Sequence, residues 1–213
     1  MIALIEIIEN LSKLRPIFYS EADFQHALAW EIHKQVYDCN MKLEYKPPQI
    51  TKRYYVDIWY SQGNYVTALE LKYKTRRLYA NVKDETFDLL TQGAQDHGRY
   101  DFLKDIQRLE EIVLKTSIVI GYAIFLTNDS AYWRRGRESQ TVDADFRIHQ
   151  DRLLTGELNW SPNASKGTKR NREEPIHIKN TYNLNWRDYS DPSAEPYGKF
   201  KYLLAKVESR KEN

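Results

Sequence analysis

The sequence predicts an α/β fold with a mixed central sheet and helices on both of its faces. A helical repeat at about residues 21–38 is followed by three strand-like segments, and a second helical repeat covers residues 100–115. An almost uninterrupted apolar run at 117–127 then has the character of a central strand that is covered on both faces. The order helix, three strands, helix, strand is typical of a layered α/β arrangement.

The first two helices carry clear local signals. Residues 2–14 place their apolar side chains near one helical face, and Glu6 and Glu9 within this run favour an amphipathic helix over a signal peptide. Ser20 followed by Asp23 predicts a capped start for the second helix, and its acidic first turn suits the helix dipole.

Three strand-like segments follow, MKLEYK at 41–46, KRYYVDIWY at 52–60 and NYVTALELKYK at 64–74. The sequence SQGN at 61–64 supplies a turn between the last two segments. These two segments therefore predict an antiparallel hairpin.

The rest of the chain is less regular. One short helix is expected in the polar stretch 75–98, where glycines act as breakers. After residue 130 the chain is polar and basic, with residues 161–175 as the clearest exposed loop. Late strands are expected at 176–186 and 199–207.

The composition predicts a cytoplasmic protein that is not embedded in a membrane. Charged residues make up 29% of the 213 residues, and no apolar run approaches the roughly 18 residues that a membrane span needs. The single cysteine, Cys39, excludes an intramolecular disulfide. No linker marks a boundary, so we expect one domain over residues 1–213, with a core at about 20–127 and a C-terminal elaboration at about 130–213.

Three charged residues, Asp57, Glu70 and Lys72, lie within segments that otherwise have the pattern of buried strands. Such a charge is costly unless it is paired, solvated or bound to a metal. Strand side chains alternate, so Glu70 and Lys72 share one face, and Asp57 lies beside Glu70 if the hairpin pairs around SQGN. Neighbouring carboxylates repel unless a cation bridges them, and their hard oxygens suit Mg²⁺. A neighbouring lysine can hold an attacking water and stabilise negative charge, as phosphodiester hydrolysis requires.

The plainer interpretation makes Glu70 and Lys72 a solvated pair on an exposed strand face. The pattern Glu-x-Lys occurs again at residues 44–46, where no well-placed strand aspartate precedes it. On this interpretation the chain is an interaction protein, Glu70 is exposed, and Asp57 does not cluster with it.

Asp57, twelve intervening residues and the run Glu-Leu-Lys at 70–72 resemble the signature of the PD-(D/E)XK nuclease superfamily. The core of that superfamily, the restriction-endonuclease-like fold, is a helix, three antiparallel strands, a helix and a fourth strand. Residues 20–127 follow the same order, so the resemblance covers about the first two-thirds of the chain. One departure is that Val56 stands where the signature has a proline.

The resemblance implies a role for each of these residues. Asp57 and Glu70 would bind Mg²⁺ or Mn²⁺ together with the main-chain carbonyl of Leu71, and Lys72 would position the attacking water. Glu21, at the start of the capped helix, matches a further metal-binding glutamate found in many members. The alternative role of Glu21 is to complement the helix dipole. Cleavage would leave a 5′-phosphate and a 3′-hydroxyl.

Basic residues in the C-terminal part are candidates for contact with nucleic acid, expected to be DNA. Residues 130–213 hold 16 Lys+Arg against 12 Asp+Glu, whereas residues 1–129 hold 16 against 18. Phosphate contacts are the usual source of sequence-independent affinity, although charged loops are often only solvated. The candidates, which have Tyr132, Trp133 and Trp160 as aromatic neighbours, are Arg134, Arg135, Arg137, Lys166, Lys169, Arg170 and Arg172.

Asp105 and Arg108 stand three residues apart on the second core helix, which predicts a local ion pair. Arg108 or Lys104 could instead neutralise a phosphate.

The sequence as a whole predicts a Mg²⁺-dependent endonuclease. The alternative is a catalytically inactive nucleic-acid-binding or assembly module on the same fold. A homodimer would suit cleavage of both DNA strands, but no residue of the sequence indicates one.

Overall fold

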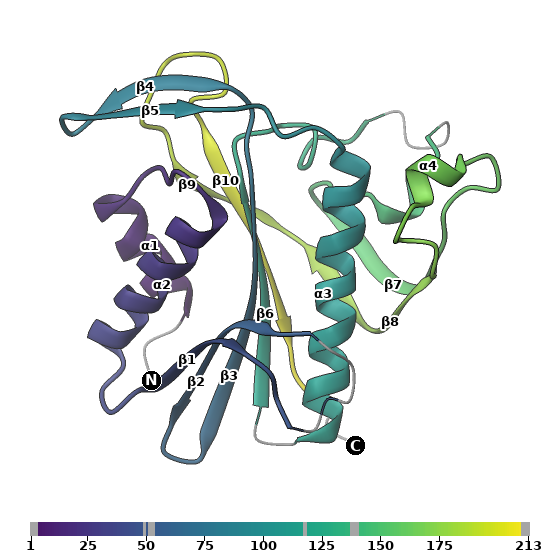
Figure 1. Cartoon of the computed structure of the whole chain (residues 1–213), viewed down its shortest axis with the longest axis horizontal. Coiled ribbons are helices and arrows are strands. Elements are labelled where there is room, and N and C mark those ends of the chain that lie inside the picture. Colours follow the sequence, from purple (N-terminus) through teal and green to yellow (C-terminus); the bar gives the residue numbers. More distant parts are fainter. Residues whose placement is uncertain (1–3, 49, 51–53, 117–118, 137–140, 210–213) are drawn as a thin grey trace.

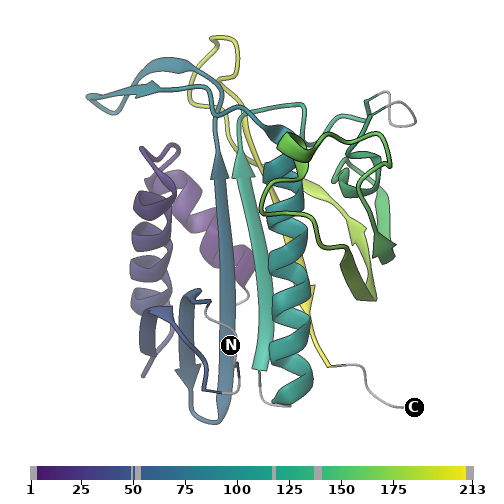
Figure 2. The ribbon, with the colours of Figure 1, turned by 45° about the vertical axis from the view of Figure 1, so that its right-hand side comes forward.

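The computed structural model describes residues 4–48, 50, 54–116, 119–136 and 141–209. A mixed sheet forms its centre, with six strands in the order β1 (Asn40–Tyr45), β2 (Val56–Gln62), β3 (Tyr65–Lys74), β6 (Val119–Thr127), β10 (Phe200–Val207) and β9 (Trp186–Ser190). Helices α1 (Leu4–Leu14) and α2 (Glu21–Gln35) lie on one side of the sheet, and α3 (Gln95–Lys115) lies on the other (Figures 1 and 2). The expected α/β class is therefore confirmed.

The sheet combines two kinds of pairing. β3 and β6 are parallel, whereas β1–β2, β2–β3, β6–β10 and β10–β9 are antiparallel. The hairpin of β2 and β3 turns at Gly63, whose φ of +57° lies in the left-handed region that glycine adopts without strain. The helix, three strands, helix and strand that were expected are α2, β1 to β3, α3 and β6.

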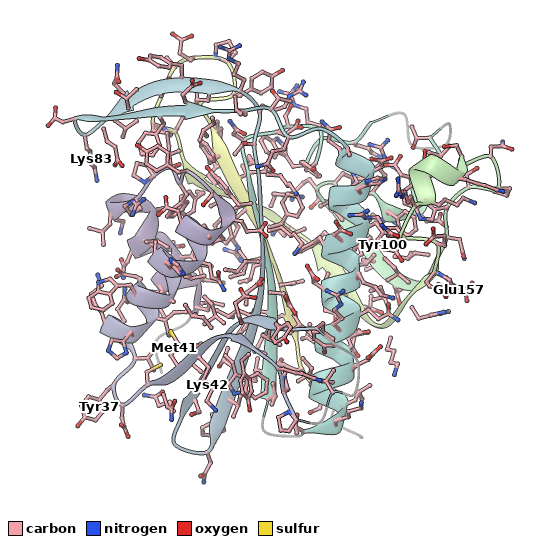
Figure 3. All side chains as sticks on the ribbon, in the orientation of Figure 1. Tyr37, Met41, Lys42, Lys83, Tyr100 and Glu157 are labelled. Atoms are coloured by element: carbon pink, nitrogen blue, oxygen red, sulfur yellow. The ribbon has the colours of Figure 1, made fainter. Side chains whose placement is uncertain are left out.

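The short helix expected in residues 75–98 is absent from this described stretch. A hairpin of β4 (Leu78–Val82) and β5 (Glu85–Leu89) takes its place, and α3 begins at Gln95. The two-residue turn between β4 and β5 has φ values of 51° at Lys83 and 63° at Asp84, and the common hairpin turns require such positive values. The turn contains no glycine, so the sequence lacks the usual signal that would predict a hairpin here. Lys83 reaches from the hairpin tip to the carbonyls of Lys13 and Leu14, at the end of α1 (Figure 3).

The C-terminal part adds a two-stranded sheet beyond α3 and two strands to the central sheet. β7 (Arg152–Leu158), which the sequence did not reveal, pairs with β8 (Ile176–Leu184) beyond α3. The connection between them contains the short helix α4 (Lys166–Lys169). The late strands expected from the sequence are β8 and β10, and β10 extends the central sheet next to β6.

Two hydrophobic clusters lie on opposite sides of the sheet. Leu69, Leu71 and Tyr73 of β3 belong to the cluster beneath α1 and α2, whereas Ala68 belongs to the cluster beneath α3. The period-two alternation of a strand therefore places Glu70 and Lys72 on one face, as expected, and this is the face that α3 covers. In the described residues no helix, α3 included, combines the length and apolar character that a membrane span requires.

Candidate active site

The candidate site lies where β2 and β3 separate. Their pairing begins beside the turn at Gln62 and Tyr65 and ends at Ile58 and Leu69, while β3 continues to Lys74. Beyond Leu69 the side of β3 that faced β2 loses its strand partner. The buried N–H groups on that side need other acceptors, because an unpaired buried donor is costly.

Two carboxylates accept these N–H groups. The N–H of Leu71 donates to Asp57 Oδ2 at 2.6 Å, and the N–H of Tyr73 donates to Glu21 Oε2 at 2.7 Å. Glu21 is in place because α2 begins there: Ser20 Oγ accepts a hydrogen bond from the N–H of Asp23 at 3.1 Å, which confirms the predicted cap. The glutamate of the helix and the aspartate of β2 are thus brought to the same edge of β3.

Gln25, one turn further along α2, holds the backbone of this region. Its side-chain amide donates to the carbonyl of Asp57 at 2.7 Å and to Glu44 Oε1 at 2.8 Å. Glu44 belongs to the second Glu-x-Lys pattern. Through this hydrogen bond with Gln25 it supports the site at Asp57, and it does not form a second site. Sequence reasoning missed Gln25. Its spacing of four residues from Glu21 was the available signal, since this spacing places two side chains on one helical face.

Glu70 is a deeply buried acid of the site, with 3% of its surface exposed. Within the described part of the chain its Oε1 atom has no hydrogen-bond partner. Burial raises the pKa of Glu70 well above its ordinary value, and the carboxylates of Asp105 and Asp57 raise it further. The interpretation that placed an exposed Glu70 far from Asp57 is therefore wrong.

Asp57 is also a perturbed acid. Burial raises its pKa to about 7, against the lowering effects of Lys72 and of the hydrogen bond from Leu71. The carboxylates of Asp105 and Glu21 contribute to the same rise. Two neighbouring acids that resist ionisation are a frequent property of catalytic and metal-binding sites.

Lys72 connects the sheet to α3. Its ammonium lies 2.7 Å from Asp105 Oδ2 and donates to the carbonyl of Leu71 at 3.0 Å. Burial alone would lower the pKa of Lys72, but the carboxylates of Asp105 and Glu21 outweigh this effect and raise it. Asp105 also forms the expected local ion pair with Arg108, at 2.9 Å. The pairing of Asp105 with Lys72 was not foreseen.

The donor set has the chemistry of a divalent-cation site. If all four carboxyl groups were ionised, they would exceed the two cations of the site by two charges. The groups are Glu21, Asp57, Glu70, Asp105, Lys72 and Arg108. Carboxylate and carbonyl oxygens are the ligands that Mg²⁺ and Mn²⁺ prefer, and Glu70 Oε1 is a buried acceptor without a donor. In the arrangement described, no three His, Cys, Asp or Glu side chains of the described residues converge closely enough to hold a metal ion.

Comparison with known proteins assigns no family. No protein-family model, curated protein or solved structure matches this chain. The function is therefore inferred from the residues of the site.

A pocket of about 320 Å³ opens beside Lys72. One wall is a polar stripe of α3, which includes Asp101, Lys104 and Arg108, and the other is formed by residues 171–174. Arg172 makes two contacts of 2.7 Å with the carboxylate of Asp101. Tyr100, on the side of α3 that faces this segment (Figure 3), donates to the carbonyl of Glu174 at 2.7 Å. Arg172 is thus the basic candidate that the structure brings to the site.

The other basic candidates that the structure describes do not line this pocket. Arg134 and Arg135 are exposed and line two different hollows, neither of which includes Asp57, Glu70 or Lys72. Lys166 and Lys169 are in α4 and Arg170 follows it, whereas Arg137 lies outside the described residues. Their aromatic neighbours are not free to stack on bases, because Tyr132 and Trp160 are buried in the core and Trp133 packs against it.

Proposed function

We propose that this chain is a divalent-metal-dependent nuclease of the PD-(D/E)XK type, with a restriction-endonuclease-like core, that hydrolyses phosphodiester bonds in DNA. The observation that carries the proposal is the buried Glu70, whose Oε1 atom has no hydrogen-bond partner among the described residues, beside Asp57 and the Lys72 ammonium, where β2 and β3 separate. The order α2, β1 to β3, α3 and β6, with β6 parallel to β3, supports the same core.

Asp57, Glu70 and the carbonyl of Leu71 would hold the metal ion, with Glu21 beside them. When bound, a divalent cation polarises the scissile phosphate and lowers the pKa of a bound water. The backbone N–H groups of β3 fix one oxygen each of Asp57 and Glu21, so these carboxylates keep their orientation before any ion binds. Such preorganisation lowers the reorganisation needed during the reaction.

Lys72 would act through its positive charge. Because the neighbouring carboxylates raise its pKa, the amine keeps its proton at neutral pH and does not serve as a base. Its ammonium can orient the attacking water and stabilise the charge that develops on the phosphate. In the overall reaction the oxygen of water bonds to phosphorus and the bond from phosphorus to O3′ breaks. The hydroxyl remains on the 5′-phosphate and the proton ends on the 3′-oxygen.

The pocket beside Lys72 would receive the phosphates that flank the scissile bond. Arg108 and Arg172 reach it from α3 and from the C-terminal part, and each already pairs with a carboxylate of α3. Paired guanidinium groups are held in place, and they can exchange a carboxylate for a phosphate of similar geometry.

Removal of the Lys72 ammonium tests this proposal. Wild-type protein should cleave DNA with Mg²⁺ or Mn²⁺ and stop when EDTA is added. Lys72→Met should lower the rate by about 10²–10³-fold, because preorganised charge stabilisation has that magnitude. Lys46→Met, in the second Glu-x-Lys pattern, is the matched control and should cleave like the wild type. Single- and double-stranded DNA and RNA serve as substrates, and circular dichroism verifies folding.

Two results would count against the proposal. If the wild type binds Mn²⁺ but cleaves none of the substrates, the inactive nucleic-acid-binding module becomes the better description. If Lys46→Met and Lys72→Met lose activity equally while both stay folded, the activity does not come from the site at β3.

A further inference from the structure

The Lys72 ammonium lies between two oxygen atoms from different elements. It donates to the carbonyl of Leu71 on β3 and pairs with Asp105 Oδ2 on α3. The carbonyl of Leu71 is one of the proposed metal ligands. An ion that used this carbonyl would compete with the ammonium for the same oxygen.

Asp105 belongs to the same group of acids as Glu70. Both are buried, with 2% and 3% of their surfaces exposed, and α3 packs against β3. Lys72, which shares its face of β3 with Glu70, lies 2.7 Å from Asp105 Oδ2, so Asp105 belongs to the side of α3 that covers this face. The unpartnered Oε1 of Glu70 is therefore a buried acceptor within this group.

A purely structural ion pair would explain only part of this arrangement. Arg108 already neutralises one oxygen of Asp105, and Lys72 neutralises the other. Neither cation contacts Glu70 Oε1, and a buried carboxylate oxygen without a donor costs free energy. The free acceptor is accounted for if a cation binds there.

We propose that Asp105 is a further acidic residue of the divalent-cation site, and that the Lys72 ammonium holds the cation's place in the metal-free protein. When the ion binds, Glu70 and Asp105 both contribute to it, Asp105 directly or through a metal-bound water, and Lys72 leaves the carbonyl of Leu71. The inference rests on the proposed function for the location of the site. It assigns Asp105 a role that the sequence pattern did not contain.

Binding of Mn²⁺ alone tests the inference without any cleavage assay. The titrations, by calorimetry or electron paramagnetic resonance, use wild type, Asp105→Asn and Lys72→Met. Asp105→Asn should weaken Mn²⁺ binding by about tenfold or more, the usual effect of losing such a metal-site group. Lys72→Met should strengthen it, because the competing ammonium is gone. Asp101→Asn is the matched control: Asp101 lies one turn earlier on α3, pairs with an arginine, and its change should leave the affinity close to the wild type.

Each result decides the matter. Equal Mn²⁺ affinity in the wild type and Asp105→Asn, or an equal loss in Asp105→Asn and Asp101→Asn, would overturn the assignment of Asp105. Weaker Mn²⁺ binding by Lys72→Met than by the wild type would overturn the position assigned to the ammonium. This comparison can still be made if Asp105→Asn fails to fold. Wild-type protein that binds no Mn²⁺ would overturn both. A protein with the expected Mn²⁺ pattern but no nuclease activity would refute the proposed function and leave this inference standing.

Discussion

Asp57 and Glu70 sit in surroundings that oppose their ionisation. Burial raises the pKa of both carboxyl groups, and each lies near other acids. In the unfolded chain an aspartate loses its proton near pH 4, whereas the pKa of Asp57 in the native protein is about 7. Between these values the native state binds a proton that the unfolded state does not. The contribution of Asp57 to the stability of the metal-free protein therefore falls as pH rises from about 4 to about 7, and the cost persists above that range.

Replacement of Asp57 with Asn should remove this cost. The amide oxygen of Asn can still accept the N–H of Leu71, but the side chain never becomes charged. In EDTA, Asp57→Asn should be more stable than the wild type by about 1–3 kcal/mol at pH 8, and the difference should vanish toward pH 4. Urea unfolding of both proteins at several pH values measures the stability difference and its dependence on pH.

A change on an exposed face of α1 provides the control for this experiment. Glu6 is exposed, so Glu6→Gln should differ from the wild type by a small amount that does not follow the same pH curve. If Asp57→Asn is less stable than the wild type at pH 8, the ionised carboxylate of Asp57 stabilises the fold, and its pKa in the native protein is not raised.

At the scale of elements, α3 brings the two parts of the candidate site together. Asp101, Lys104, Asp105 and Arg108 line the pocket at spacings of three and four residues, so they form one stripe of the helix. The stripe meets Lys72 of β3 on one side and Arg172 of the C-terminal part on the other. A single helix thus connects the proposed chemistry with the proposed contact to substrate.

Arg172 should contribute to DNA binding more than to the chemical step. Loss of one phosphate contact reduces the slope of log affinity against log salt by about one. Arg172→Gln should therefore weaken DNA binding, lower that slope by about one and raise KM, with little change in kcat. Fluorescence anisotropy over a series of salt concentrations in Ca²⁺ measures the binding.

Arg187, an exposed cation on the edge strand β9, is the control for Arg172. Arg187→Gln should leave both the affinity and the salt slope close to those of the wild type. The same decrease in both variants would indicate a general charge effect, and an unchanged slope in Arg172→Gln would remove Arg172 from the interface.

At the scale of the whole molecule, the C-terminal part is built into the rest of the fold. β10 pairs with β6 in the central sheet, and one hydrophobic cluster contains residues of both parts. Glu110, a buried residue of α3, accepts the N–H groups of Lys179 and Asn180 and the hydroxyl of Tyr182. These contacts lead us to expect that the parts unfold together.

Glu110→Ala tests that expectation. It removes a buried acceptor of two backbone N–H groups and a hydroxyl, and should lower the free energy of unfolding by about 3 kcal/mol. Unfolding monitored by far-ultraviolet circular dichroism and by tryptophan fluorescence should shift together. Glu111→Ala, the neighbouring position on the same helix, should have a small effect. A fluorescence transition that shifts alone would mean that the C-terminal part unfolds separately.

The sequence by itself determined the features that depend on local periodicity. Alternation along β3 placed Glu70 and Lys72 on one face, the Ser20 cap set the start of α2, and the helical repeat at 100–115 predicted most of α3. These signals lie within one element, so they can be detected without knowledge of the fold. The α/β class followed from their order.

Only the tertiary structure decided which side chains meet. Asp105 and Arg172 lie far along the chain from Lys72, and they reach the site because α3 packs against β3 and the connection after α4 folds back onto α3. The β4–β5 hairpin was hidden for a related reason, since Lys83 and Asp84 turn without a glycine and Phe87 packs into a core built from distant residues. Such contacts depend on packing between elements, and a local sequence pattern does not indicate which elements will pack together.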